Sequence, residues 1–254
     1  MEIDNIYNMD CLEGMKQIPD GTIDAVICDL PYGVLNKQNE HVKWDCPIPF
    51  EPLWEQYLRI TKEHAPIVLF GQGMFTAQTM MSQPDLWRYN WVWDKGRVSD
   101  FFNANKRPLK CTEDIMVFCK HEPIYHPQMI VGTKHERRNS RSKYHEATNR
   151  CFGGIKDNGT RTSDEYFPRR LIHIQNYVEK NLHPTQKPVD LLRYLVLTYT
   201  NEGDTVLDNC MGSGTTAIAC IKERRHFIGF ELSKEYFDKA VRRIKAEQAQ
   251  LTLF

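Results

Sequence analysis

Residues 205–231 have the sequence TVLDNCMGSGTTAIACIKERRHFIGFE and form the most informative stretch of this 254-residue chain. The stretch begins with a short apolar run that ends at Asp208 and continues into the turn Gly212-Ser213-Gly214. A second apolar run follows and ends at Glu231. A strand, a glycine turn, a helix and a second strand in this order predict a βαβ unit, which belongs to a parallel sheet covered by helices.

The glycine turn of this unit favours a nucleoside cofactor. Glycines let the backbone pass close to a ligand, and the start of the next helix offers free N–H donors. Glu231, at the end of the second strand, is placed to accept hydrogen bonds from ribose hydroxyls. The spacing Gly212-x-Gly214 matches neither G-x-G-x-x-G nor G-x-x-x-x-G-K-[ST], so neither a dinucleotide nor a triphosphate is favoured. A tight turn that binds no ligand fits the same pattern.

Outward from this unit, apolar runs alternate with stretches of helical spacing over most of the chain. This alternation predicts the α/β class, with a doubly wound, mostly parallel sheet. Strands are predicted at 23–28, 66–70, 87–93, 114–119, 205–208 and 226–230, and helices at 52–64, 188–199, 217–223 and 233–248.

Residues 121 to about 180 break this pattern because they have little apolar periodicity. From Lys134 to Arg170 there are ten Lys or Arg and five Asp or Glu, a local balance of +5 in a chain of zero net charge. A loop-rich segment of this length is usually functional or disordered. We therefore expect one domain, 1–254, that carries an inserted region at about 121–180.

A second motif, Asp29-Leu30-Pro31-Tyr32, follows the apolar run 23–28. In a doubly wound sheet, ligands bind outside the carboxyl ends of the strands. Asp29 and the carbonyl of Leu30 can each accept a hydrogen bond from an amino group, Pro31 holds the turn rigid, and Tyr32 offers a ring for stacking. The motif suits a flat heterocycle with an exocyclic amino group, although a surface turn with a satisfied Asp29 fits it as well.

In combination, these motifs resemble those of the β-class amino-methyltransferases of DNA. That family has Asp-Pro-Pro-Tyr near the N-terminus, then a target-recognition region, a His-Pro-Thr-Gln-Lys-Pro segment, and Asp-Pro-Phe-x-Gly-Ser-Gly-Thr-Thr near the C-terminus. Similar segments occur here, in the same order, at 29–32, 183–188 and 208–216. Three further segments resemble parts of the family's cofactor pocket and later strands: 8–12, 91–95 and 113–118.

The resemblance implies a Rossmann-like methyltransferase fold of the S-adenosyl-L-methionine-dependent type, with an inserted target-recognition region. The implied reaction is an SN2 methyl transfer to an exocyclic amino nitrogen of a flipped base. Asp29 and the Leu30 carbonyl would localise the amino lone pair, with Pro31 fixing the turn and Tyr32 stacking on the base. Because Asp in the first position correlates with adenine in this family, N6 of adenine is the expected acceptor.

The resemblance also implies how S-adenosyl-L-methionine is held. Glu231 would bind the ribose, and Gly212, Ser213 and Gly214 would approach the ribose and the methionine portion. A solvated surface lysine is the alternative for Lys187. The full implied set is Asp10 and Cys11 beside the adenine, His183, Thr185 and Lys187 near the methionine end, and Asp29, Asp208, Gly212, Ser213, Gly214, Thr215 and Glu231.

Double-stranded DNA is the implied partner, and basic residues of the inserted region are its candidate contacts. A solvated, disordered loop is the alternative for this region. A homodimer and a cognate restriction endonuclease are further partners that the family allows. We expect no metal site, since no C-x-x-C pair occurs. We also expect no membrane span and a cytoplasmic location. The candidate DNA contacts are Arg137, Arg138, Arg141, Lys143, Arg150, Arg161, Arg169 and Arg170.

Two departures from the family pattern keep alternatives open. Leu30 replaces the first proline of the catalytic motif, and Asn209-Cys210 replaces Pro-Phe in the glycine motif, where an aromatic ring would face the cofactor's adenine. The alternatives are methylation of N4 of cytosine on the same scaffold, and a DNA-binding module with a vestigial cofactor pocket. A dehydrogenase is disfavoured by the glycine spacing.

Overall fold

The computed structural model describes residues 1–33, 45–137, 161–176 and 185–251. The chain divides into two compact units, each described by itself. The first consists of Met1–His126 and Arg170–Phe254, and the second of Pro127–Arg169.

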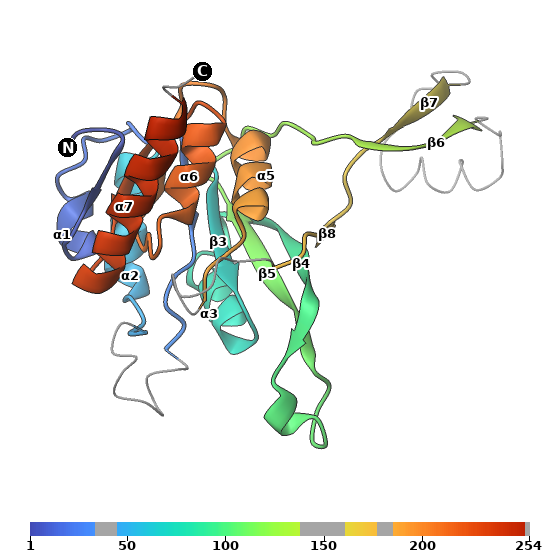
Figure 1. Ribbon diagram of the computed structural model, residues 1–254, viewed down its shortest axis with the longest axis horizontal. Helices are drawn as coiled ribbons and strands as arrows, with labels where there is room; N and C mark the ends of the chain where they lie inside the picture. The colour runs from blue at the N-terminus through green and yellow to red at the C-terminus, as the bar shows by residue number, and fades with distance from the viewer. Residues whose placement is uncertain (34–44, 138–160, 177–184, 252–254) are drawn as a thin grey trace. The chain divides into compact units, whose positions relative to one another are not determined.

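An eight-stranded sheet in the order β1-β10-β9-β2-β3-β5-β4-β8 forms the centre of the first unit (Figure 1). β5 runs antiparallel to both neighbours, β3 and β4, and the remaining pairings of this sheet are parallel. The predicted mostly parallel sheet is therefore confirmed. The strands are β1 (Asn5–Tyr7), β2 (Ala25–Cys28), β3 (Ile67–Gly71), β4 (Trp87–Ser99), β5 (Lys110–Phe118), β8 (Leu171–His173), β9 (Thr205–Asp208) and β10 (His226–Phe230).

Helices cover both faces of this sheet. Side chains of a strand alternate between the faces, so Val68 and Phe70 of β3 pack in one core while Ile67 and Leu69 pack in the other. The first core is completed by α5 (Val189–Tyr199), α6 (Thr215–Lys222) and α7 (Lys234–Leu251), and the second by α1 (Cys11–Met15), α2 (Phe50–Ile60) and α3 (Met74–Ser82).

The chain leaves the middle of the sheet in two opposite directions. From β2 it passes through α2 to β3 on one side, and from β9 it passes through α6 to β10 on the other. β2 and β9 are adjacent and parallel, with Val26 opposite Leu207. Such a reversal creates a crevice at the carboxyl ends of the two strands, where open α/β sheets bind ligands.

The second unit contains a two-stranded antiparallel sheet of β6 (Ile130–Arg137) and β7 (Arg161–Tyr166). Neither strand was expected, because polar side chains interrupt any apolar alternation. β8 also falls within the region predicted as an insertion, yet it pairs with β4 in the main sheet. Within the described ranges, none of the helices combines the length and apolar character needed to cross a membrane.

Candidate active site

Two turns lie side by side at the carboxyl ends of β2 and β9. The first begins at Asp29, directly after β2, and the second runs from Asn209 to Gly214, directly after β9. The motifs quoted from opposite ends of the sequence therefore meet at the reversal point of the sheet. Hydrogen bonds fix the side chains of both turns, and these contacts indicate what each residue can do.

Asp29 accepts hydrogen bonds at both carboxylate oxygens. Oδ1 accepts from the Tyr32 hydroxyl at 2.9 Å, and Oδ2 accepts from Nζ of Lys187 at 2.5 Å. The Asp29 side chain remains 25% exposed, and each oxygen has two lone pairs, so a further donor can be accepted. Burial raises the pKa of Asp29, and the Lys187 ammonium only partly opposes that shift.

Lys187 lies between two carboxylates and is itself 9% exposed. Its Nζ is 3.3 Å from Oε2 of Glu113, and Lys95 approaches the other oxygen of Glu113 at 3.2 Å. Burial alone would lower the pKa of Lys187, but Asp29 and Glu113 outweigh burial and raise it. Likewise, the two lysines outweigh burial and lower the pKa of Glu113. The four side chains form a chain of alternating charge that keeps Asp29 paired.

Sequence reasoning gave no role to Lys95 or Glu113. Both belong to long strands, Lys95 to β4 and Glu113 to β5, and one aspartate separates each of them from an apolar run. A charged residue at the end of an apolar strand was the available signal. Because a buried charge is costly without a partner, such a residue warrants a search for its counter-charge.

The turn after β2 is held on several sides. The Leu30 side chain is buried in the core beneath α2, so this replacement of proline supports the turn by packing. The Tyr32 ring stacks on Phe75 at a centroid distance of 4.6 Å. The backbone N–H of Gly33 donates to Oδ1 of Asp45 at 2.9 Å. These contacts hold the turn in place although Leu30 lacks the fixed φ of a proline.

Asp208 stabilises the glycine turn from within. Its Oδ2 accepts from the Thr216 hydroxyl at 2.6 Å, and its Oδ1 accepts from the backbone N–H of Cys210 at 3.0 Å. Burial raises the pKa of Asp208 to about 6. Gly212 and Gly214 adopt φ angles of 54° and 81°, which side chains disfavour. The sequence-predicted glycines are thus required by the backbone.

Glu231 is positioned by backbone donors. Its Oε2 accepts from the N–H of Gly212 at 2.8 Å, and its Oε1 accepts from the N–H of Ser233 at 2.8 Å. Burial raises the pKa of Glu231. Arg243 of α7 donates to the carbonyl of Ser213 at 3.3 Å and to the Thr215 hydroxyl at 3.1 Å. The glycine turn is therefore anchored to β10 and to α7.

The segment after β1 adjoins the glycine turn. Asp10 caps α1, and its Oδ1 accepts from the N–H of Leu12 at 2.8 Å. Nδ2 of Asn209 donates to Sγ of Cys11 at 3.7 Å, while Oδ1 of Asn209 accepts from the Tyr57 hydroxyl at 2.5 Å. Asn209, which replaces a proline of the family motif, thus ties the glycine turn to α1 and α2.

For the remaining predicted site residues the structure gives fewer contacts, and some of them lie outside the described ranges. Arg137 and Arg161 lie directly opposite each other in β6 and β7. Arg170 belongs to the first unit, where its guanidinium lies 5.9 Å from the Tyr89 ring centroid. Thr185 and Arg169 are exposed. Five residues fall outside the described ranges: His183, Arg138, Arg141, Lys143 and Arg150.

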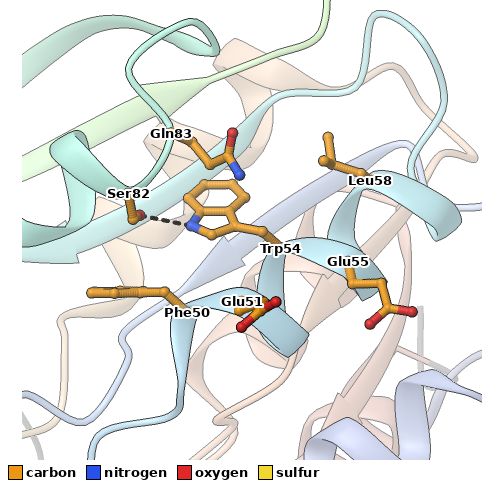
Figure 2. Close-up of a pocket in the computed structure, with 7 residues that line it drawn as sticks. All are labelled: Phe50, Glu51, Trp54, Glu55, Leu58, Ser82 and Gln83. Atoms are coloured by element: carbon orange, nitrogen blue, oxygen red, sulfur yellow. Dashed lines mark hydrogen bonds between the residues drawn. The ribbon is translucent and has the colours of Figure 1, made fainter.

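A shallow groove between α2 and α3 has a different character from these turns (Figure 2). Figure 2 shows Trp54 at its centre, where Nε1 donates to Oγ of Ser82 at 2.8 Å. Glu51 and Glu55 also line the groove. Two carboxylates disfavour phosphate or DNA, and none of the predicted site residues lines this groove.

Comparison with known proteins identifies the family. The family described as DNA methylase matches residues 23–242, and the chain belongs to that family. It is therefore a DNA methyltransferase, and the expected resemblance is confirmed. S-adenosyl-L-methionine is the methyl donor of this family, as expected from the motifs.

One relative, DNA adenine methyltransferase YhdJ of Escherichia coli strain K12, is 26% identical over 262 residues, covering 96% of this chain and 83% of the relative. The M1.HpyAVI–SAM complex has a TM-score of 0.62 at 24% identity, covering 94% of this chain and 98% of the other. PvuII DNA methyltransferase, described as cytosine-N4-specific, has a TM-score of 0.64 at 18% identity, covering 97% and 91%. The predicted Rossmann-like methyltransferase fold is confirmed.

The residues at the crevice fit S-adenosyl-L-methionine chemically. Glu231 keeps lone pairs for ribose hydroxyls after accepting its two backbone hydrogen bonds. Oε1 of Gln186 is buried without a hydrogen-bond partner among the described residues and directly precedes Lys187 in the chain. A buried acceptor of this kind suits an ammonium group such as that of the methionine portion.

Proposed function

We propose that this protein transfers a methyl group to N6 of adenine in double-stranded DNA after flipping the base out of the duplex. The observation that carries the proposal is the position of Asp29 at the reversal point of the sheet, beside the glycine turn. Two further points support adenine: the family associates Asp in this position with adenine, and one relative is described as an adenine methyltransferase.

The turn after β2 would activate the amino nitrogen. An exocyclic amino group is a poor nucleophile because its lone pair is delocalised into the ring. Hydrogen bonds from its two hydrogens to Asp29 and to the Leu30 carbonyl would localise that lone pair. Pro31 would hold the two acceptors in a fixed relative orientation. The face of the Tyr32 ring opposite Phe75 would stack on the base, which offsets part of the cost of flipping.

Lys187 and Glu113 would set the charge of this acceptor site. Lys187 donates to Asp29 and so favours its ionised, accepting form despite burial. Glu113 shares the same ammonium, and its negative charge adds to the rise in the pKa of Asp29. Preorganised charges of this kind supply much of the rate enhancement in many enzymes.

S-adenosyl-L-methionine supplies an electrophilic methyl group when it is bound. We place its ribose at Glu231, its adenine near Asp10 and Cys11, and its methionine end near Lys187 and the glycine turn. Asp208 would act by holding the turn, since both of its oxygens already accept hydrogen bonds.

Methylation of plasmid DNA with tritiated S-adenosyl-L-methionine, followed by nucleoside mass spectrometry, tests this function. We expect N6-methyldeoxyadenosine from the native protein and no product from the Asp29→Ala variant. Met81→Ala is a suitable control because this exposed side chain on α3 belongs to neither turn. Tritium transfer without N6-methyldeoxyadenosine would refute the adenine assignment, and no transfer at all would favour a vestigial site.

Methylation of cytosine at N4 is the second candidate. The structural similarity to the PvuII enzyme, described as cytosine-N4-specific, supports it, because the two proteins share a fold. The same experiment separates the two products, since N4-methyldeoxycytidine has a different mass from N6-methyldeoxyadenosine.

A further inference from the structure

The hairpin of β4 and β5 extends well beyond the strands beside it. β3 ends at Gly71, opposite Asp114 of β5, whereas β4 and β5 remain paired as far as Ser99 and Lys110. β4 runs in the same direction as β3, so the extension leaves the sheet at the carboxyl edge, where Asp29 lies. Figure 1 shows it as the green projection that ends in a short helical turn, η2 (Phe101–Asn103).

The tip of this hairpin exposes large apolar side chains. Phe102 is fully exposed and Phe101 is 62% exposed, so neither supports the fold by burial. The tip is nevertheless ordered by its own contacts. Oδ1 of Asp100 accepts from Asn103 at 2.6 Å, and Oδ2 accepts from Nε of Arg107 at 2.8 Å. An ordered turn that presents an exposed aromatic ring is suited to insertion into a partner.

The charge of the same tip is complementary to nucleic acid. Residues 97–110 contain four basic side chains and one acidic side chain, a net charge of +3 in a neutral protein. All four basic side chains are exposed. They are Arg97, Lys106, Arg107 and Lys110.

We propose that the hairpin tip, residues 97–110, is a DNA-contacting element in which Phe102 inserts into the duplex beside the flipped base while basic side chains contact phosphates. Aromatic and apolar wedges enter DNA at base steps, and lysine or arginine contacts to phosphate provide the surrounding attraction. A ring in the duplex occupies the space that the departing base leaves. The inference rests on the proposed function, because it places the duplex against the edge that carries Asp29.

Two variants separate the roles of the ring and of the charge. Phe102→Ala removes a fully exposed side chain, and Lys106→Glu reverses an exposed charge. Met81→Ala and Lys245→Glu are matched controls at exposed positions on α3 and α7. Binding is measured by fluorescence anisotropy with a labelled 30-base-pair duplex and S-adenosyl-L-homocysteine over a range of salt concentrations, and circular dichroism checks the fold.

We expect Phe102→Ala to weaken duplex binding by about 5- to 100-fold without changing its salt dependence, as for lost base stacking. Lys106→Glu should weaken binding and reduce the slope of log K against log salt by about one. Control variants should match the native protein. If both hairpin variants bind like the controls, the hairpin is not a DNA contact.

The same proteins, assayed for methyl transfer, distinguish this inference from the proposed function. Loss of duplex binding in the hairpin variants would support the DNA contact even if the native protein formed no N6-methyldeoxyadenosine. Conversely, native transfer to adenine with unchanged binding and turnover in both hairpin variants would leave the proposed function intact and overturn the DNA contact.

Discussion

Asp29 has two protein donors and retains capacity for a third, so the carboxylate can act as the acceptor for a substrate amino group. Asp29→Asn keeps the shape but replaces one acceptor oxygen by a donor. We predict a fall in kcat of about 100- to 1,000-fold, the usual cost of losing a preorganised electrostatic contact. Thermal shift with S-adenosyl-L-homocysteine should show unchanged cofactor binding. Normal turnover in this variant would remove Asp29 from the mechanism.

Lys187 forms ion pairs with two carboxylates, and its loss leaves Asp29 without an ion-pair partner and Glu113 with Lys95 alone. We predict that Lys187→Met lowers the free energy of unfolding by about 3–5 kcal/mol, as for one half of a buried pair. Lys62→Met is the control. Lys62 also forms an ion pair, with Asp24, but its side chain is 52% exposed. That change should cost at most about 1 kcal/mol. Equal losses in urea denaturation would contradict a buried charge network.

Asp208 introduces a pH dependence of stability. Burial raises its folded pKa to about 6 from an ordinary value of 3.8. Between these values the folded state binds the proton that the unfolded state has lost, so stability falls as pH rises through this window. The fall from this group is about 3 kcal/mol. Asp208→Asn removes this titrating carboxyl group. We therefore predict that the free energy of unfolding of the variant rises relative to that of the native protein as the pH increases from 4 to 6.5.

Chemical denaturation of both proteins at several pH values measures that difference. Groups whose pKa does not depend on the Asp208 charge contribute equally to the two proteins, so the comparison isolates Asp208 together with its effect on Glu231. A difference that stays constant across the window would show that the carboxyl group titrates normally.

At the scale of elements, the glycine turn between β9 and α6 depends on Gly214 for two reasons. Its φ is +81°, and an added Cβ would lie 3.2 Å from Cβ of Ala240 on α7. Gly203 has φ +83° but nothing within 4 Å of an added Cβ. We predict that Gly203→Ala costs about 1–2 kcal/mol from backbone strain, and that Gly214→Ala costs at least about 1 kcal/mol more from crowding.

Urea unfolding of the two variants gives the comparison directly. Reduced binding of S-adenosyl-L-homocysteine should accompany Gly214→Ala only. If the two variants lose equal stability, the close approach of α7 does not constrain the turn.

The sequence predicted strands well where an apolar run was bounded by residues that favour turns. β2 and β3 are continuous apolar runs and β10 is nearly so, which is how fully buried strands appear. α3 was missed because its apolar residues follow no single face, with Met74 and Met81 both exposed. β1, α1 and β8 span only three to five residues each, too short for periodicity.

At the scale of the whole molecule, the candidate site joins residues far apart in the chain. Motif order indicated that the turns after β2 and β9 belong together, but the contact of Lys187 with Asp29 spans 158 residues and has no signature in spacing. Glu113 enters the same network from the antiparallel strand β5. Such partners depend on strand order and register, which local pattern does not contain.

The structure of the protein crystallised with S-adenosyl-L-homocysteine is the most direct test of the shared crevice. We predict that the ligand's sulfur lies between Asp29 and Gly212 at the carboxyl ends of β2 and β9, with its ribose hydroxyls on Glu231. A ligand bound in the groove between α2 and α3, or at the opposite edge of the sheet, would contradict the account.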